Sequence, residues 1–148
     1  MINLLIAVVS PVPWSEAARR LTLAVILGGI IGWDREHESK AAGLRTNMLV
    51  SLAAALVILG ALQSGIGQQD ESLIGRSIQG ILTGVGFVGA GAIWQRNEKN
   101  KVHGLTTATA IWISSGLGIV SGLGLWQLGL MGLGFTIIIL RIIKLLEN

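Results

Sequence analysis

The sequence contains no cysteine and few charged residues. Without cysteine, the chain cannot form disulfides, thiolate metal sites or a thiol nucleophile. Only 13% of its 148 residues are charged while 51% are hydrophobic, and the charges gather in clusters between long uncharged stretches. A soluble domain of this length would distribute charge over its whole surface. The composition therefore predicts a protein that crosses a membrane several times.

Acidic residues are also absent from the interior of every predicted membrane span. Many pumps and proton-coupled carriers have a carboxylate near the middle of the membrane. His37 and His103 have neither a second metal ligand nor a serine or cysteine at useful spacing. We therefore expect no enzyme activity, no metal site and no cofactor. The net charge of +3 is better explained by membrane topology than by nucleic-acid binding.

A charged segment of fourteen residues occurs twice, 61 residues apart and without a gap. Six of the fourteen positions are identical, where chance would give about one. The identical pairs are Trp33 and Trp94, Arg35 and Arg96, Lys40 and Lys101, Gly43 and Gly104, Leu44 and Leu105, and Thr46 and Thr107. An apolar run precedes and follows each copy. The sequence therefore predicts two copies of a helical hairpin plus additional segments.

We predict an all-α integral membrane protein with about five transmembrane helices. Residues 104–140 carry no charge, and one helix of that length would be about 55 Å long, well beyond a hydrocarbon core of about 30 Å. This stretch must therefore fold back, and residues 121–124 form the natural turn. Residues 17–148 are expected to form one transmembrane domain, with helices over 17–33, 46–67, 77–95, 104–121 and 123–143.

The apolar residues 1–12 precede Pro13 and are too short to cross a membrane. They have no basic residue before them and no convincing small-residue cleavage site. We interpret residues 1–16 as an interfacial lead-in, and cleavage of a signal peptide as the less favoured alternative.

The lysines and arginines predict the orientation of the chain. Eight of them fall on one side of the predicted membrane and three, Arg19, Arg20 and Arg76, on the other. The positive-inside tendency then places the N-terminus outside, and both repeated loops and the C-terminus in the cytoplasm of a bacterial cell. Because both hairpins share one orientation, the repeat is expected to be parallel, with the fifth helix outside it.

Glycines are abundant in the predicted helices. Residues 84–89 match the Gly-x-Gly-x-x-Gly pattern of dinucleotide-binding loops, but that motif requires a preceding strand and a later acidic residue. Close packing of membrane helices is the favoured interpretation. Whether the glycine faces meet within one chain or in a homo-oligomer stays open. The predicted packing positions are Gly28, Gly32, Gly80, Gly84, Gly86, Gly89, Gly91, Gly118 and Gly122.

The repeated loops share the pattern Lys-x-x-Gly-Leu-x-Thr. The glycines permit a sharp return into the membrane, and Thr46 and Thr107 are suited to cap the helices that follow. Two helix N-termini surrounded by cations would attract an anion or the acidic side chains of a partner, although the cations could instead only set topology and meet lipid headgroups. The candidate binding residues are Asp34, Arg35, Lys40, Arg45, Thr46, Arg96, Lys101, Thr106 and Thr107.

Asp34, Glu36 and Glu38 lie close together in the sequence, as ligands of a divalent cation would. Alternate positions on a helix do not converge, however, and three cations crowd the same loop. We favour a salt-bridged loop in which Asp34 pairs with Arg35, Arg45 or Arg96.

Several segments resemble the MgtC/SapB family: residues 28–36, 40–46, 86–91 and 104–108, in order along residues 17–141. The Ala-Gly-Leu-Arg-Thr and Gly-Leu-Thr-Thr-Ala blocks are the most specific. The resemblance implies a bacterial inner-membrane protein linked to growth and virulence at low magnesium, with ATP synthase as a partner of the named member. Two features depart from the family: it usually has Glu at the position of Asp34, and well-studied members carry a soluble C-terminal domain.

We expect the protein to bind a membrane partner or an anionic ligand at its paired cytoplasmic loops, in magnesium or phosphate homeostasis. The alternative is a transporter of Mg²⁺ or another small solute. A cation path would require acids or helix breaks at mid-depth. The acids are absent, but helices could break at the glycine clusters, so transport stays the alternative.

Overall fold

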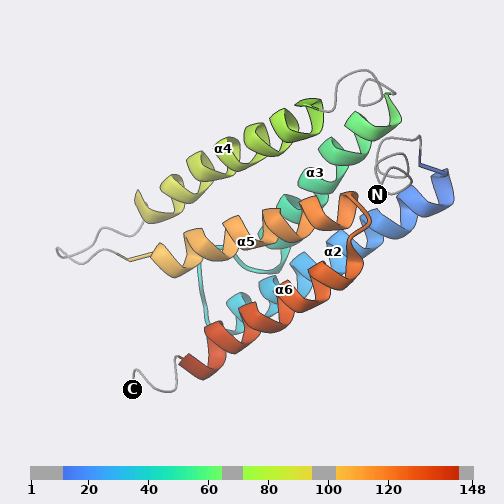
Figure 1. Cartoon of the computed structure of the whole chain (residues 1–148). Coiled ribbons are helices and arrows are strands. Elements are labelled where there is room, and N and C mark those ends of the chain that lie inside the picture. The colour runs from blue at the N-terminus through green and yellow to red at the C-terminus, as the bar shows by residue number, and fades with distance from the viewer. Residues whose placement is uncertain (1–11, 65–71, 95–102, 144–148) are drawn as a thin grey trace.

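The structure is a computed structural model that describes residues 12–64, 72–94 and 103–143. Within these ranges the chain is helical and has no strand, as expected from the sequence. Its helices are α2 (Trp14–His37), α3 (Leu44–Gln63), α4 (Ser72–Trp94), α5 (Leu105–Gly122) and α6 (Trp126–Ile138), and the π-helix η2 (Ile139–Ile143) continues α6 (Figure 1).

The observed ends of the helices differ from the predicted ones. α2 extends beyond the predicted range 17–33 at both ends, and α4 begins at Ser72 and not at residue 77. The break between the last two helices was expected at residues 121–124. α5 ends at Gly122, and Gly124 adopts a left-handed φ of 81° before α6 begins.

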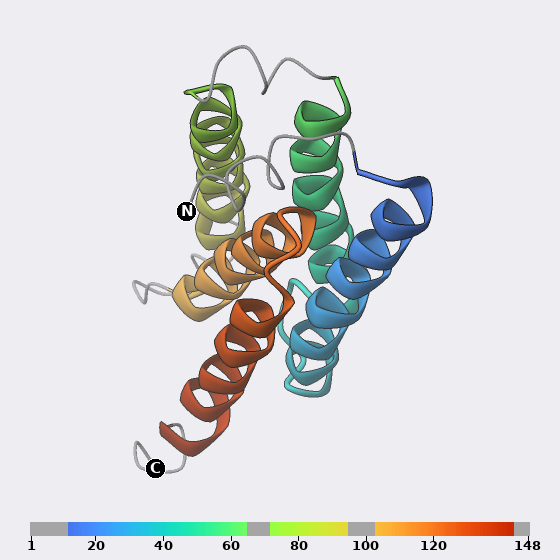
Figure 2. The same cartoon turned by 45° about the vertical axis from the view of Figure 1, so that its right-hand side comes forward.

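Successive helices run in alternating directions (Figures 1 and 2). α2, α3 and α5 form the centre of the bundle and pack against one another. α4 packs mainly on α5, while α6 lies against α5 and α2. Two apolar clusters fill the centre: one surrounds Ile58 and Leu62, and the other surrounds Leu27 and Ile31.

Among the residues that the structure describes, three helices are long and apolar enough to cross a membrane: α3, α4 up to Ile93, and α5. Their mean hydropathies are 1.8, 1.3 and 1.2. Large hydrophobic side chains also point away from the bundle, among them Phe87 on α4 and Phe135 on α6, which are 84% and 67% exposed. Exposed apolar surface of this kind is expected where helices face lipid.

Four of the predicted packing glycines lie at close helix contacts. A Cβ atom added to Gly28 would lie 2.5 Å from the carbonyl oxygen of Asn47, and one added to Gly32 would lie 2.7 Å from Cα of Leu44. A Cβ atom added to Gly118 would clash with the backbone of Ser51, and one added to Gly122 would clash with the Ile58 side chain. These glycines let α2 and α5 approach α3 closely.

The predicted packing glycines of α4 make no close contact within this chain, so their packing against a second copy stays a prediction. A Cβ atom added to Gly80, Gly84, Gly86 or Gly91 would meet no atom within 4 Å, and one added to Gly89 would make an ordinary 3.5 Å contact with Cβ of Ala108. α4 turns Gly89 toward α5, so the stripe formed by Gly80, Gly84 and Gly91 points away from the bundle. Helical spacing predicted a common face but not its direction.

Candidate functional site

Two charged residues are buried near the end of α2. Asp34 and Arg35 are only 4% and 3% exposed. Adjacent helix positions point about 100° apart, so both can be buried only where the helix is enclosed on several sides. α3 and α5 pack along α2, and η2 reaches the end of it. A buried charge is stable only when it is paired with an opposite charge, and Asp34 and Arg35 carry opposite charges.

The carboxylate of Asp34 accepts hydrogen bonds from two arginines. Nε and Nη2 of Arg35 lie 3.0 and 2.5 Å from Oδ2, and Nε of Arg141 lies 2.7 Å from Oδ1. The Arg141 side chain is 64% exposed, so the cluster opens to solvent on that side. The predicted pairing of Asp34 with Arg35 is confirmed. The partner from η2 was not foreseen.

The loop after α2 is shaped by backbone hydrogen bonds. The N–H of Ser39 donates to Glu36 O and that of Lys40 to Arg35 O, and Ser39 adopts a positive φ of 52°. The chain then reverses, and α3 begins at Leu44. Oε2 of Glu36 accepts the N–H of Leu44 at 2.7 Å, so a carboxylate occupies the positive end of α3.

The expected capping by threonine is wrong. The residues that precede α3 and α5 are Gly43 and Gly104, and neither helix has a side-chain cap at that position. Thr46 and Thr107 are each the third residue of their helix, and Thr107 is buried. α3 begins two residues before its predicted start at residue 46, and α5 begins one residue after its predicted start at residue 104. In the first loop the Glu36 carboxylate, and not Thr46, accepts a hydrogen bond from the N-terminus of the helix.

The first predicted loop does not present all its cations to a ligand. Arg35 is buried against Asp34, and the N-terminus of α3 already holds Glu36. Of the remaining candidates in this loop, Lys40 is half-buried and Arg45 is exposed. In the second loop Thr106 is exposed. Arg96 and Lys101 lie outside the described residues, and so does the expected approach of the two loops.

Asn47 connects this loop to α5, and the sequence analysis missed it. Its fully buried amide donates to Ala42 O and Gly43 O at 3.0 and 2.9 Å, and its Oδ1 accepts from Oγ of Ser114 at 2.8 Å. Ser51, one turn further along α3, donates to Ala24 O and so links α3 to α2. The available signal was a small set of uncharged polar residues within apolar helices, where such side chains commonly bond across helices.

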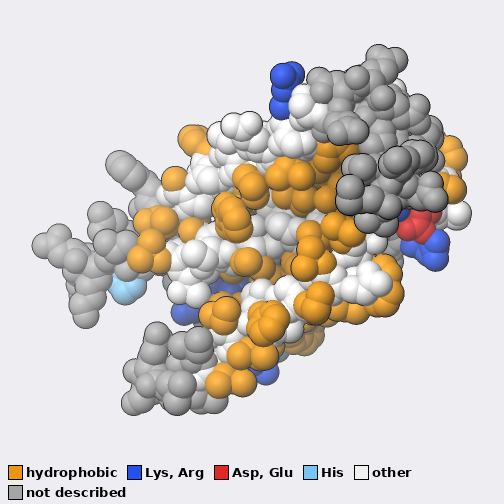
Figure 3. All heavy atoms as spheres, in the orientation of Figure 1, with side chains coloured by type: hydrophobic (Ala, Val, Ile, Leu, Met, Phe, Trp, Pro, Cys, Tyr) orange, Lys and Arg blue, Asp and Glu red, His pale blue; other side chains and the backbone are white. Residues whose placement is uncertain are grey.

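The end of the bundle that contains Asp34 and the loop between α2 and α3 presents a partly cationic surface. Charged side chains are few on the face shown in Figure 3 and lie toward the ends of the helices, whereas hydrophobic ones spread along α5 and α6. No group of three His, Cys, Asp or Glu residues that could hold a metal occurs in the described parts of the chain. Arg45 and Arg141 are the described cations that this end exposes most fully, since Lys40 is half-buried and Arg35 is buried.

Comparison with known proteins identifies the family. The sequence model of the MgtC family matches residues 21–148. The chain is 42% identical over 146 residues to SrpB of Synechococcus elongatus, an alignment that covers 91% of this chain and 79% of SrpB. It is 37% identical to YhiD of Escherichia coli K12, described as a proposed magnesium transporter, and 40% identical to MgtC of Salmonella typhimurium LT2.

The last two alignments cover 86% and 81% of this chain but only 60% and 48% of the relatives, so the chain spans about half the length of MgtC. No solved structure matches. The family match and the apolar helices agree on a membrane protein. The chain belongs to the MgtC family.

Proposed function

We propose that this protein acts in magnesium or phosphate homeostasis of a bacterial inner membrane by binding, and not as an enzyme. Its ligand would be a membrane partner or an anion held at the cytoplasmic end of the bundle. ATP synthase is the partner that the family resemblance implies. The observation that carries this proposal is the buried Asp34, which holds Arg35 and the exposed Arg141 at one end of a tightly packed helix pair.

The charges at this end favour an acidic or anionic ligand. Asp34 is buried between two guanidinium groups, and the Glu36 carboxylate is engaged by the N–H of Leu44. The exposed Arg45 and Arg141 are therefore the charges most available to a ligand. Cations held on packed helices bind at low entropic cost because they are already in place.

The proposed topology has five spans, with the N-terminus outside and the C-terminus in the cytoplasm. The alternating helix directions support it, since they bring Asp34, Arg45 and Arg141 to one end of the bundle and Arg20 and Arg76 to the other (Figure 1). α6 and η2 together supply the fifth span.

The proposed internal repeat is supported by matching positions in the two hairpins. α3 and α5 begin at Leu44 and Leu105, each directly after a glycine. Gly28 faces Asn47, and Gly89 faces Ala108. Both members of the second pair lie 61 residues after those of the first. The glycines differ in conformation, with φ of −90° at Gly43 and 96° at Gly104, so the two loops enter their helices differently.

Substitution of the exposed cations tests the binding proposal. Arg45→Gln should impair growth at low magnesium while the protein inserts normally, because it removes a ligand-facing charge and no internal contact. Arg76→Gln, which removes an exposed charge from the opposite end, is the matched control. Full activity of a double Arg45→Gln, Arg141→Gln variant that is correctly inserted would refute the proposal.

Transport of Mg²⁺ is the second candidate, and the description of YhiD favours it. Purified protein in liposomes should then carry Mg²⁺ inward, and Asp34→Asn should abolish that flux. The binding proposal expects no flux above that of empty liposomes. The position of the described carboxylates supports binding, because Glu16, Asp34, Glu36 and Glu38 all lie near the ends of α2 and none lies at mid-depth.

A further inference from the structure

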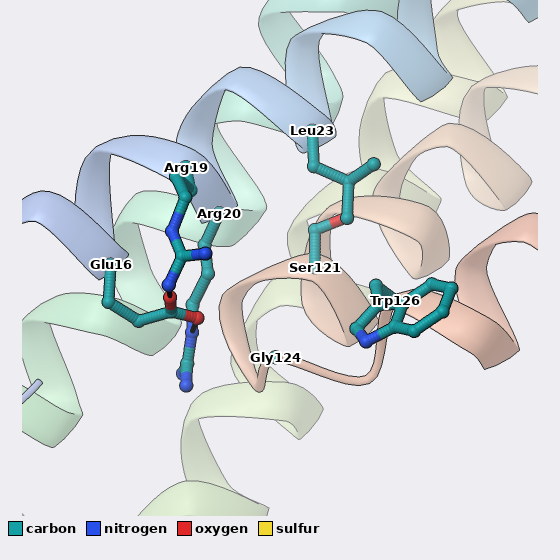
Figure 4. Close-up of a pocket in the computed structure, with 7 residues that line it drawn as sticks. All are labelled: Glu16, Arg19, Arg20, Leu23, Ser121, Gly124 and Trp126. Atoms are coloured by element: carbon teal, nitrogen blue, oxygen red, sulfur yellow. Dashed lines mark hydrogen bonds and ion pairs between the residues drawn. The ribbon is translucent and has the colours of Figure 1, made fainter.

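A cavity lies at the opposite end of the molecule from Asp34, where α2 begins and α5 turns into α6 (Figure 4). Its volume is about 180 Å³, more than ten times the ~15 Å³ that a single water needs. Glu16, Arg19 and Arg20 form one side, and Trp126 lies across from them (Figure 4). Leu23 supplies an apolar part of the wall.

Arg20 is held in place at this cavity. Its Nε donates to Oε1 of Glu16 and its Nη1 to Gly122 O, both at 2.9 Å. Gly124 leaves room for the guanidinium, because an added Cβ atom would lie 2.7 Å from Cζ of Arg20. A guanidinium group has five N–H donors, so these two bonds leave three for a ligand.

Two further features make the cavity positive. Arg19 lies at the rim with its side chain 79% exposed, so two arginines face the single carboxylate of Glu16. α6 begins at Trp126, and its first helical hydrogen bond is donated by Gly129 to Leu125 O. The N–H groups of residues 126–128 therefore precede the helical ladder at the positive end of the helix dipole.

The position of the cavity relates it to the membrane surface. The candidate span α5 ends at Gly122, immediately beside the cavity. Trp126 is 53% exposed, and tryptophan is enriched where membrane meets water. A ligand here would place a polar group among arginines and an apolar group along Leu23.

We propose that this cavity binds a phosphate group, supplied by the headgroup of a phospholipid in the adjoining leaflet or by free phosphate. Guanidinium groups and helix N-termini both match the oxygens of such an anion. The apolar wall and the position at the end of a span favour the lipid as the source. This site is separate from the cytoplasmic one proposed above, so each can fail without the other.

Purified protein in detergent tests the proposal. Its thermal stability would be measured with short-chain phosphatidylglycerol or inorganic phosphate, at an ionic strength balanced with sodium chloride. A ligand that binds only the folded protein raises the melting temperature as it saturates the site. We expect phosphatidylglycerol to stabilise the protein, and Arg19→Gln to weaken its binding by up to about fivefold, the upper limit for an exposed ion pair.

Arg76→Gln is the matched control, because Arg76 is an exposed arginine at the same end of the bundle but not at the cavity. It should leave binding unchanged. Stabilisation by inorganic phosphate that also depends on Arg19 would uphold the site and identify free phosphate as its source. The proposal is overturned if neither compound stabilises the protein, or if the two variants respond alike.

Discussion

Nε of Arg141 donates a 2.7 Å hydrogen bond to Oδ1 of Asp34, a residue 107 positions earlier in the chain. The bond joins the π-helix that ends the described chain to the end of α2. Asp34 also accepts both hydrogen bonds of Arg35 on its other oxygen. One buried carboxylate thus links a fully buried arginine to an exposed one, and the two arginines should respond differently to substitution.

Arg35→Gln should lower the free energy of unfolding far more than Arg141→Gln. Removing one partner of a buried ion pair destabilises a protein by about 3–5 kcal/mol, whereas an exposed pair contributes about 0–1 kcal/mol. Chemical unfolding in detergent would measure both. Arg45→Gln, which alters an exposed side chain of the same loop, is the control. Equal effects of the two substitutions would show that the burial of Arg35 does not matter.

The two groups of glycines should behave differently. Gly118→Leu should prevent stable folding, because even a Cβ atom there would overlap the backbone of Ser51. Gly84→Leu has open space and should leave the stability of the monomer nearly unchanged. Thermal stability and size-exclusion chromatography would be measured together. A Gly84→Leu variant that elutes as a smaller species than the parent would instead show that α4 packs against a second copy.

Ser114 and Ser115 are adjacent, equally buried and differently bonded. Ser114→Ala removes the donor to Oδ1 of Asn47 and should cost about 1–3 kcal/mol of stability, because a buried acceptor is left unsatisfied. Ser115 Oγ has no hydrogen-bond partner, so Ser115→Ala should be neutral or stabilising. Paired unfolding curves give the comparison directly. A larger loss from the Ser115 change would contradict the hydrogen-bond network around Asn47.

The proposed topology can be tested with single cysteines, since the chain has none of its own. Ala41→Cys lies in the loop between α2 and α3, and Ser64→Cys lies at the opposite end of α3; both positions are exposed. A membrane-impermeant thiol reagent applied to intact cells should label position 64 and leave position 41 unlabelled. The reverse pattern would invert the topology, and labelling of both would end the proposal that α3 spans the membrane.

Much of the helical architecture follows from local sequence features. The scarcity of charge and the long apolar runs predicted helices, and the excessive length of residues 104–140 predicted the break that Gly124 makes. The charged loop predicted that Asp34 pairs with Arg35, Arg45 or Arg96, and Arg35 is one of its partners. These predictions succeed because helix length, apolar composition and glycine conformation depend on residues close together in the chain.

The tertiary structure decided which of these residues meet distant partners. Periodicity placed Gly28 and Gly84 equally well on glycine faces, but only the packing of α3 against α2 covers the first and leaves the second open. The packing of the other helices likewise brought Arg141 to Asp34 and Ser114 to Asn47. It also placed Arg20 beside the turn at Gly124. A side chain's face follows from its position in the helix, whereas the neighbour of that face depends on how all the helices pack together.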